Sequence, residues 1–245
     1  MESTRVSPDT AQDVESAKEC LLFNDQSIRS AFVKKVFTLV TIMFAILSIM
    51  CAMPFIFPDF RIWVQNNLVF LYISMGVFIA VSIALMCVTS LRRSYPANLI
   101  ALGIFTLAAG YMTMAITSAY TVQSVLLALC ITTGSCAAII VFAIFAKRDL
   151  TSLIGLAYVF GTTLMFFGIT AMIACFAFNV TFLYTVYAAL GALLSMLYLA
   201  IDIQLLMGGR RFALSQEEYV FASMQIFLDI LNIFLFILQI FGKSN

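Results

Sequence analysis

The stretch "LAIDIQLLMGGRRFALSQEEYVFASMQIFLDILNIF", residues 199–234, carries two aspartates within otherwise apolar sequence. A helix that spans a membrane needs about 20 apolar residues, and the runs that flank the central "GGRRFALSQEE" reach that length. Asp202 falls near the end of the first run and Asp229 in the middle of the second. A carboxylate in mid-bilayer costs at least about 2.5 kcal/mol on insertion scales, so both acids are candidate functional groups.

The composition extends this reading to the whole chain. Of its 245 residues, 63% are hydrophobic and 10% are charged, whereas a soluble domain is about 45–50% apolar. The mean hydropathy is +1.08, which indicates a polytopic membrane protein. The net charge of +1 and the lack of histidine argue against nucleic-acid binding and against a histidine-based metal or proton site. The six cysteines form no CxxC pair, which disfavours a disulfide framework.

Charge-free runs predict seven membrane-spanning helices and therefore an all-α membrane protein. They lie near residues 36–57, 68–90, 97–118, 122–146, 151–176, 180–206 and 219–241. Residues 1–30 are polar and lack the apolar run of a signal peptide. We expect them to form a short, disordered cytosolic tail before a seven-helix transmembrane domain of residues 31–245.

Lysine and arginine concentrate on one side of these spans, which by the positive-inside rule is the cytosolic side. The N-terminus is then cytosolic, and Asn179 of the sequon "NVT" lies on the far side. That far side holds only Arg61 and Lys243. The cytosolic connectors hold Arg29, Lys34, Lys35, Arg92, Arg93, Lys147, Arg148, Arg210 and Arg211.

Polar and small residues follow one face of each of the last two helices. Gln225, Asp229 and Asn232 recur at i, i+4 and i+7, continued by Phe236. The other stripe consists of Tyr184, Tyr187, Gly191, Ser195, Tyr198 and Asp202. Because lipid penalises polar groups, we expect both stripes to face inward. Ser195, Tyr198, Gln225 and Asn232 are therefore candidates for a polar or pore-lining face.

The two carboxyl groups are expected to converge. With about 1.5 Å of rise per residue, Asp202 lies about 8 Å and Asp229 about 15 Å inside the cytosolic edge, and their side chains lean towards each other because the helices run in opposite directions. Two close carboxyl groups in a low dielectric cannot both ionise cheaply. A shared proton would hold the helices together, and its loss would leave two charges that Ca²⁺ can bridge transiently. Asp202 and Asp229 are thus the predicted pH sensor, gate and transient metal ligands, with no other cofactor.

Simpler readings of these residues stay open. The acids can act as protonated, hydrogen-bonded packing contacts, or pair with Arg92 or Arg93, which can equally be loop charges that set topology. Ser215 can act as the N-cap of a helix, with Glu218 three residues later, and this spacing is typical of a capping box. We favour this interpretation over a role of Glu217 and Glu218 in calcium entry. The glycines at 208 and 209 read as a helix C-cap.

Enzymatic readings are weaker. Paired intramembrane aspartates also occur in presenilin-like proteases, but Asp229 stands in "IFLDIL" where those have G-x-G-D, and Asp202 in "LAIDIQ" where those have Y-D. Hydrolase, zinc-protease and nucleotide-binding motifs are missing from the sequence. We therefore expect a protein without catalytic activity.

The chain resembles the lifeguard branch of the transmembrane Bax-inhibitor-motif family from about residue 25 to the end. The long match is "YLAIDIQLLMGGRRFALSQEEYVFASMQIFLDILNIFLFILQIFG" from Tyr198, and the shorter ones are "DQSIRSAFVKKVF", "RRSYPANLI", "GYMTMAITS" and "VYAALGALL". One departure is Ile203, where the branch usually has threonine after the first aspartate, which removes a hydroxyl beside the sensor and is expected to alter its hydration.

The resemblance implies a Bax-inhibitor-like bundle with a central seventh helix. It also implies a pH-dependent calcium leak from intracellular stores, suppression of cell death, and residence in the endoplasmic reticulum, Golgi or related membranes. In that family two aspartates form the pH sensor and an arginine on the second helix acts as a latch, a role open here to Arg92 and to Arg93. The implied partners are the bilayer, Ca²⁺ and membrane apoptosis regulators or calcium channels.

Two other functions remain as alternatives. A non-conducting membrane protein could bind death-pathway or channel proteins, and the remote alternative is an intramembrane aspartyl protease. A seven-helix receptor is disfavoured, because the connectors are too short for an outer ligand-binding loop.

Overall fold

The computed structural model describes residues 8–178, 181–208 and 218–243, and the regular elements among them are all helices. They are α1 (Pro8–Ile56), α2 (Pro58–Asn66), α3 (Leu68–Cys87), α4 (Thr89–Arg93), α5 (Ala97–Ser118), α6 (Val122–Phe145), the 3-10 turn η1 (Leu150–Leu153), α7 (Ile154–Phe178), α8 (Thr181–Met207) and α9 (Tyr219–Phe241). Seven segments are long and apolar enough to cross a membrane, which confirms the predicted all-α membrane protein. Their bounds are Ser27–Ile56, Leu68–Cys87, Ala97–Ser118, Val122–Phe145, Leu150–Cys175, Phe182–Met207 and Tyr219–Phe241.

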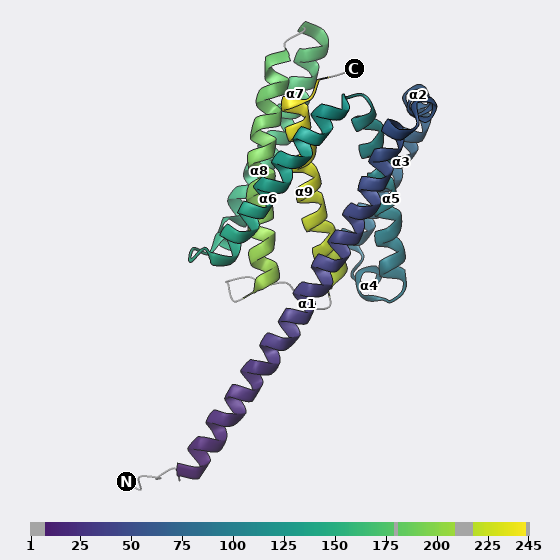
Figure 1. The fold of residues 1–245 in the computed structure, drawn as a ribbon. Coiled ribbons are helices and arrows are strands. Elements are labelled where there is room, and N and C mark those ends of the chain that lie inside the picture. Colours follow the sequence, from purple (N-terminus) through teal and green to yellow (C-terminus); the bar gives the residue numbers. More distant parts are fainter. Residues whose placement is uncertain (1–7, 179–180, 209–217, 244–245) are drawn as a thin grey trace.

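The last helix, α9, is the centre of the bundle. It packs against α8, α1, α6 and α5 and is the most buried of the seven spans; Figure 1 shows it between α1 and the α6–α8 pair. Phe227 of α9 anchors the core, with its ring centroid 4.7 Å from that of Phe44 and 5.9 Å from that of Phe105. The helices α3 and α7 flank the bundle and are the least buried spans, so their apolar side chains face lipid.

The N-terminal segment differs from the prediction. Residues from Pro8 onward are helical and continue without a break into the first span, so that α1 extends well beyond the bundle (Figure 1). Residues 9–35 contain neither glycine nor proline, and Pro8 stands in the first turn, where proline is tolerated. Nothing in the local sequence therefore ends the helix between the expected tail and the first span.

Side chains from distant elements hold the connectors. Arg61 of α2 donates hydrogen bonds to the carbonyl oxygens of Ser118 (2.8 Å) and Tyr120 (3.1 Å) at the end of α5. At the other end of the bundle, Gln204 of α8 is buried and makes hydrogen bonds to the connector between α6 and α7. Its amide donates to the carbonyls of Ala143 (3.2 Å) and Arg148 (3.0 Å), and its oxygen accepts from the Leu150 amide (2.7 Å).

Replacing Gln204 by leucine should destabilise the protein. Each buried group that loses its partner costs about 1–3 kcal/mol, and each kcal/mol lowers the unfolding midpoint by about 2–4 °C in a chain of this size. Thermal unfolding of the purified protein in detergent measures this. The matched control is Gln239→Leu, which removes one exposed 3.3 Å bond to Tyr184. Equal midpoints for the two variants would contradict the structural role of Gln204.

Candidate functional site

The predicted aspartate pair is assembled between α8 and α9. The carboxyl groups of Asp202 and Asp229 lie within hydrogen-bonding reach of each other. Asp229 is buried, Asp202 is half-buried, and Oδ2 of Asp229 is a buried oxygen without a hydrogen-bond partner in the described structure. Two carboxyl groups can form a hydrogen bond with each other only when at least one of them carries a proton.

Two cavities meet at this pair. The smaller measures about 120 Å³ and is lined by Asp202, Leu205, Phe221, Ala222, Gln225 and Ile226. The larger measures about 390 Å³ and is lined by Met86, Ile154, Tyr198, Ile201, Asp202, Leu205, Gln225, Leu228, Asp229 and Asn232. Both exceed the roughly 10–15 Å³ needed to hold a water molecule. Asp202, Leu205 and Gln225 line both cavities and therefore lie where the two adjoin.

Most of the predicted polar face lines these cavities. Gln225, Tyr198 and Asn232 do, and the Tyr198 hydroxyl donates to the carbonyl of Ala157 on α7 (2.8 Å). Ser195 is buried between helices and lines neither cavity. The same holds for Ile203, so the residue that departs from the family pattern faces the packed core and neither of the two cavities.

The expectation that both stripes face inward is wrong at two residues. Asn232 and Tyr184 are exposed. Asn232 lines the larger cavity together with Met86 of α3 and Ile154 of α7, which are exposed as well. Tyr184 lines a separate groove between α7 and α8. A polar side chain can face outward at such places because the groove, and not the lipid alone, surrounds it.

The candidate latch arginines contact a different carboxylate. Arg92 and Arg93 place Nη2 at 3.4 Å and 3.2 Å from Oε1 of Glu218, and within the described residues their ion pairs are with this acid and not with the aspartates. The Arg92 guanidinium also lies 4.8 Å from the centroid of the Phe221 ring. Phe221 lines the smaller cavity, so the cluster of Arg92, Arg93 and Glu218 lies next to this cavity.

The capping-box reading is corrected by the same contacts. The helix α9 begins at Tyr219, so Glu218 occupies the N-cap position and makes no cap hydrogen bond. Two guanidinium groups offer its carboxylate stronger, charge-assisted bonds than a backbone amide does. Ser215, Glu217, Arg210 and Arg211 lie outside the described residues, as does Asn179.

The C-cap reading agrees with the structure at Gly208. Its φ of +72° is the left-handed conformation typical of a helix C-cap. Beside it, Nη2 of Arg29 donates to the carbonyl of Leu205 (2.6 Å). An arginine at this position complements the negative end of the α8 dipole and ties α1 to the helix that carries Asp202.

A second cluster, which the sequence did not reveal, joins three helices near the start of α9. The Lys35 ammonium lies 3.3 Å from the centroid of the Tyr219 ring, and the Tyr219 hydroxyl accepts a hydrogen bond from Asn98 (2.9 Å). These residues come from α1, α9 and α5. A lone lysine, tyrosine and asparagine far apart in the chain give no local signal that they meet.

Among the described residues, no group of three or more His, Cys, Asp or Glu side chains could hold a metal ion. The pair supplies at most four carboxylate oxygens, whereas Ca²⁺ takes about six to eight. Water and the amide oxygens of Gln225 and Asn232 would have to complete the shell of any cation that stops there.

Comparisons with known proteins agree with the resemblance. A family model described as "Inhibitor of apoptosis-promoting Bax1" matches residues 29–245. Protein lifeguard 3 is 35% identical over 224 residues in Homo sapiens and 36% identical over 224 residues in Mus musculus. These matches cover 91% of this chain and 72% of each relative. Bax inhibitor 1 of Schizosaccharomyces pombe is 30% identical over 217 residues, which is 89% of this chain and 78% of the relative.

Proposed function

The chain belongs to the Bax inhibitor family of membrane proteins, and we propose that it acts as a pH-sensitive calcium leak channel of intracellular membranes. In this proposal it lowers the calcium content of a store and thereby suppresses apoptosis, without catalysing a reaction. The observation that supports it best is the contact between Asp202 and Asp229 where two cavities meet. The family description supports the protective role.

The proposed gate depends on one shared proton. With one proton, the pair forms a charge-assisted hydrogen bond, which is about twice as strong as a neutral one, and α8 and α9 stay in contact. Loss of that proton leaves two repelling charges, and a second proton leaves only a neutral bond. Calcium flux should therefore pass through a minimum and rise on both sides of it.

The proposed orientation places the N-terminus and the arginines near Glu218 in the cytosol. Arg29, Lys34, Lys35, Arg92 and Arg93 support it by the positive-inside rule. The smaller cavity then faces the cytosol, and the larger one lies deeper in the membrane. We place the protein in the endoplasmic reticulum, Golgi or related membranes, in keeping with the resemblance to the lifeguard branch.

Replacing Glu218 by glutamine should slow calcium flux without changing its pH dependence. The substitution removes one negative charge from the cluster of Glu218, Arg92 and Arg93 beside the smaller cavity, which makes this region more repulsive to Ca²⁺. Because the acid is near the surface, we expect a loss of up to about fivefold. Flux into proteoliposomes measures this, with Asp59→Asn on exposed α2 as the control. A shifted pH minimum would show that the arginines act on the aspartates after all.

The alternative is a non-conducting protein that binds death-pathway or channel proteins in the membrane. Cells that express wild type or Asp229→Asn at equal levels distinguish the two. The leak proposal expects the variant to alter luminal calcium, read with a store-targeted indicator, and to alter survival after an apoptotic stimulus. If store calcium is unaffected by either protein while both protect equally, the interaction protein is the better account.

A further inference from the structure

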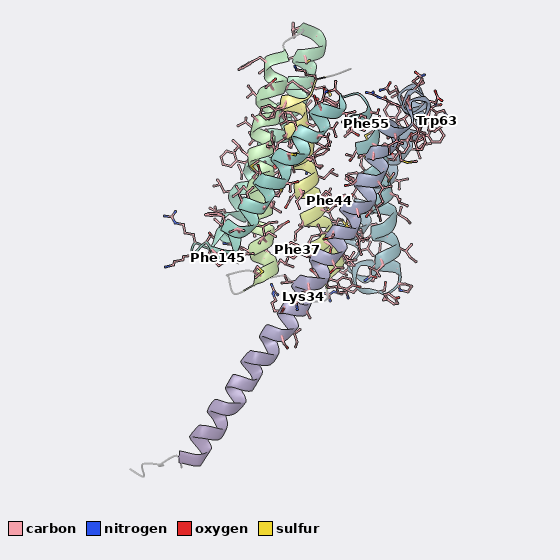
Figure 2. All side chains as sticks on the ribbon, viewed as in Figure 1. Lys34, Phe37, Phe44, Phe55, Trp63 and Phe145 are labelled. Carbon is pink, nitrogen blue, oxygen red and sulfur yellow. The ribbon has the colours of Figure 1, made fainter. Side chains whose placement is uncertain are left out.

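An apolar groove runs between α1, α6 and α9, on the opposite side of α9 from the cavity that contains Asp229. Its volume is about 780 Å³. Phe44 and Phe55 lie on the side of α1 that faces it, as Figure 2 shows. The remaining lining residues are Leu47, Ser48, Cys51, Ala52 and Ile56 of α1, Ile230, Leu231 and Phe234 of α9, and Val122, Val125, Leu126, Leu129, Thr132, Thr133, Cys136, Ala137 and Ile140 of α6.

The groove offers an apolar ligand a matching surface. Its lining consists mainly of aliphatic and aromatic side chains. Two of its hydroxyl groups are already bonded within α6, since Thr132 donates to Ala128 (2.7 Å) and Thr133 to Leu129 (2.8 Å). These hydroxyls therefore do not require a polar partner from outside.

The groove is open to the bilayer. Ala52, Leu126 and Ala137 line it and are exposed, and all three belong to membrane-spanning segments. The medium around them is hydrocarbon. A methylene group occupies about 30 Å³, close to the volume of one water molecule in the liquid. An 18-carbon chain therefore occupies about 500 Å³, which fits within the groove of about 780 Å³. A spanning helix about 30 Å long and 10 Å across does not.

Basic residues flank one end of the groove. The Arg61 guanidinium lies 5.6 Å from the centroid of the Phe55 ring. Lys243 is held against the first turn of α6, where its amide donates to Ser124 (2.9 Å) and its carbonyl accepts from Thr121 (3.1 Å). The α6 residues that follow line the groove. Cationic residues at this end of an acyl-sized groove suit the phosphate of a membrane lipid.

We propose that this groove binds one acyl chain of a bilayer phospholipid, with its phosphate near Arg61 and Lys243. The chain packs against Ile230, Leu231 and Phe234, which follow Asp229 on α9. The inference does not depend on calcium conduction, because it concerns a binding site whose occupancy is measured directly.

The test uses the full-length protein in nanodiscs that contain phosphatidylserine with a diazirine in its acyl chain. After irradiation, the labelled residues are mapped by mass spectrometry. We expect labelling to concentrate on the α6 and α1 residues of the groove. Labelling spread evenly over α6 and the lipid-facing α3 and α7 would be ordinary boundary lipid and would overturn the proposal.

Matched variants sharpen the test. Ala137→Phe fills the groove and should reduce groove labelling at least about fivefold, the smallest loss expected from overpacking a site. Ala138→Phe adds the same ring at the neighbouring exposed residue, which does not line the groove, and should label like wild type. Thr133→Phe provides a second filling variant if Ala137→Phe does not fold. Groove labelling that persists in a folded filling variant would refute the site.

The headgroup is tested separately. Lys243→Gln should reduce labelling by the phosphatidylserine probe relative to a diacylglycerol probe with the same chain, which lacks the phosphate. An unchanged ratio would contradict the placement of the phosphate. Loss of groove labelling on addition of an unlabelled sterol, but not of unlabelled phosphatidylserine, would identify a different occupant and overturn the assignment.

Discussion

Replacing either Asp202 or Asp229 by asparagine should abolish the rise of calcium flux on the alkaline side. Charge repulsion between α8 and α9 arises only while both carboxyl groups are present, because an amide neither gains nor loses a proton in this range. Two unit charges about 4 Å apart repel by about 4 kcal/mol at an effective dielectric constant of 20. A shift of that size changes a two-state equilibrium by roughly two to three orders of magnitude. Removing it should therefore abolish the rise in flux on the alkaline side.

The measurement is flux into proteoliposomes at matched protein density. Asp59→Asn removes an acid from exposed α2 and serves as the control. Asn232→Asp provides a gain-of-charge comparison, since it adds an acid to the larger cavity while both aspartates are kept. A single asparagine variant that keeps the wild-type pH profile would show that the pair does not gate the protein.

The second large effect is expected at Gly191, where α8 and α9 approach most closely near Phe236. A Cβ atom at this glycine would lie 2.5 Å from Cζ of the Phe236 ring, and that ring already packs edge-on against Tyr187, with 5.6 Å between centroids. Gly191→Val therefore has to push α9 away from α8. Overpacking of this kind costs about 1–3 kcal/mol, or a midpoint lower by about 2–12 °C.

A matched control and a rescue test this packing argument. Gly134→Val adds the same side chain on α6, where nothing lies within 4 Å of the new Cβ atom, and should leave the midpoint unchanged. Phe236→Ala should partly restore the stability of Gly191→Val, and the double-mutant cycle isolates the coupling between the two residues. Additive effects in the cycle would show that the ring does not restrict this glycine.

The spans and the aspartate pair were predictable because they depend on local or one-dimensional information. Membrane spans follow from length and hydropathy, and the predicted bounds agree with the structure to within a few residues except at the first span, where α1 is continuous. The approach of Asp202 to Asp229 follows from two antiparallel neighbours with acids at comparable depths.

The remaining contacts depend on three-dimensional packing that no local pattern reports. Arg93 and Glu218 are separated by 125 residues, and the acid fits a capping box equally well in the sequence. In the sequence, Gln204 looks like one more polar residue beside Asp202. In the structure, it makes hydrogen bonds to a connector 54–61 residues away. The exposure of Asn232 depends on a cavity to which α3, α7, α8 and α9 all contribute, and only the assembled bundle defines it.

The most direct test of the proton-sharing gate is calcium flux through reconstituted wild type from pH 6 to 8, beside the Asp202→Asn/Asp229→Asn double variant. The account predicts a minimum for wild type, with flux rising on either side, and a flat profile for the double variant. Identical profiles for the two proteins, or no flux above protein-free liposomes at any pH, would contradict it.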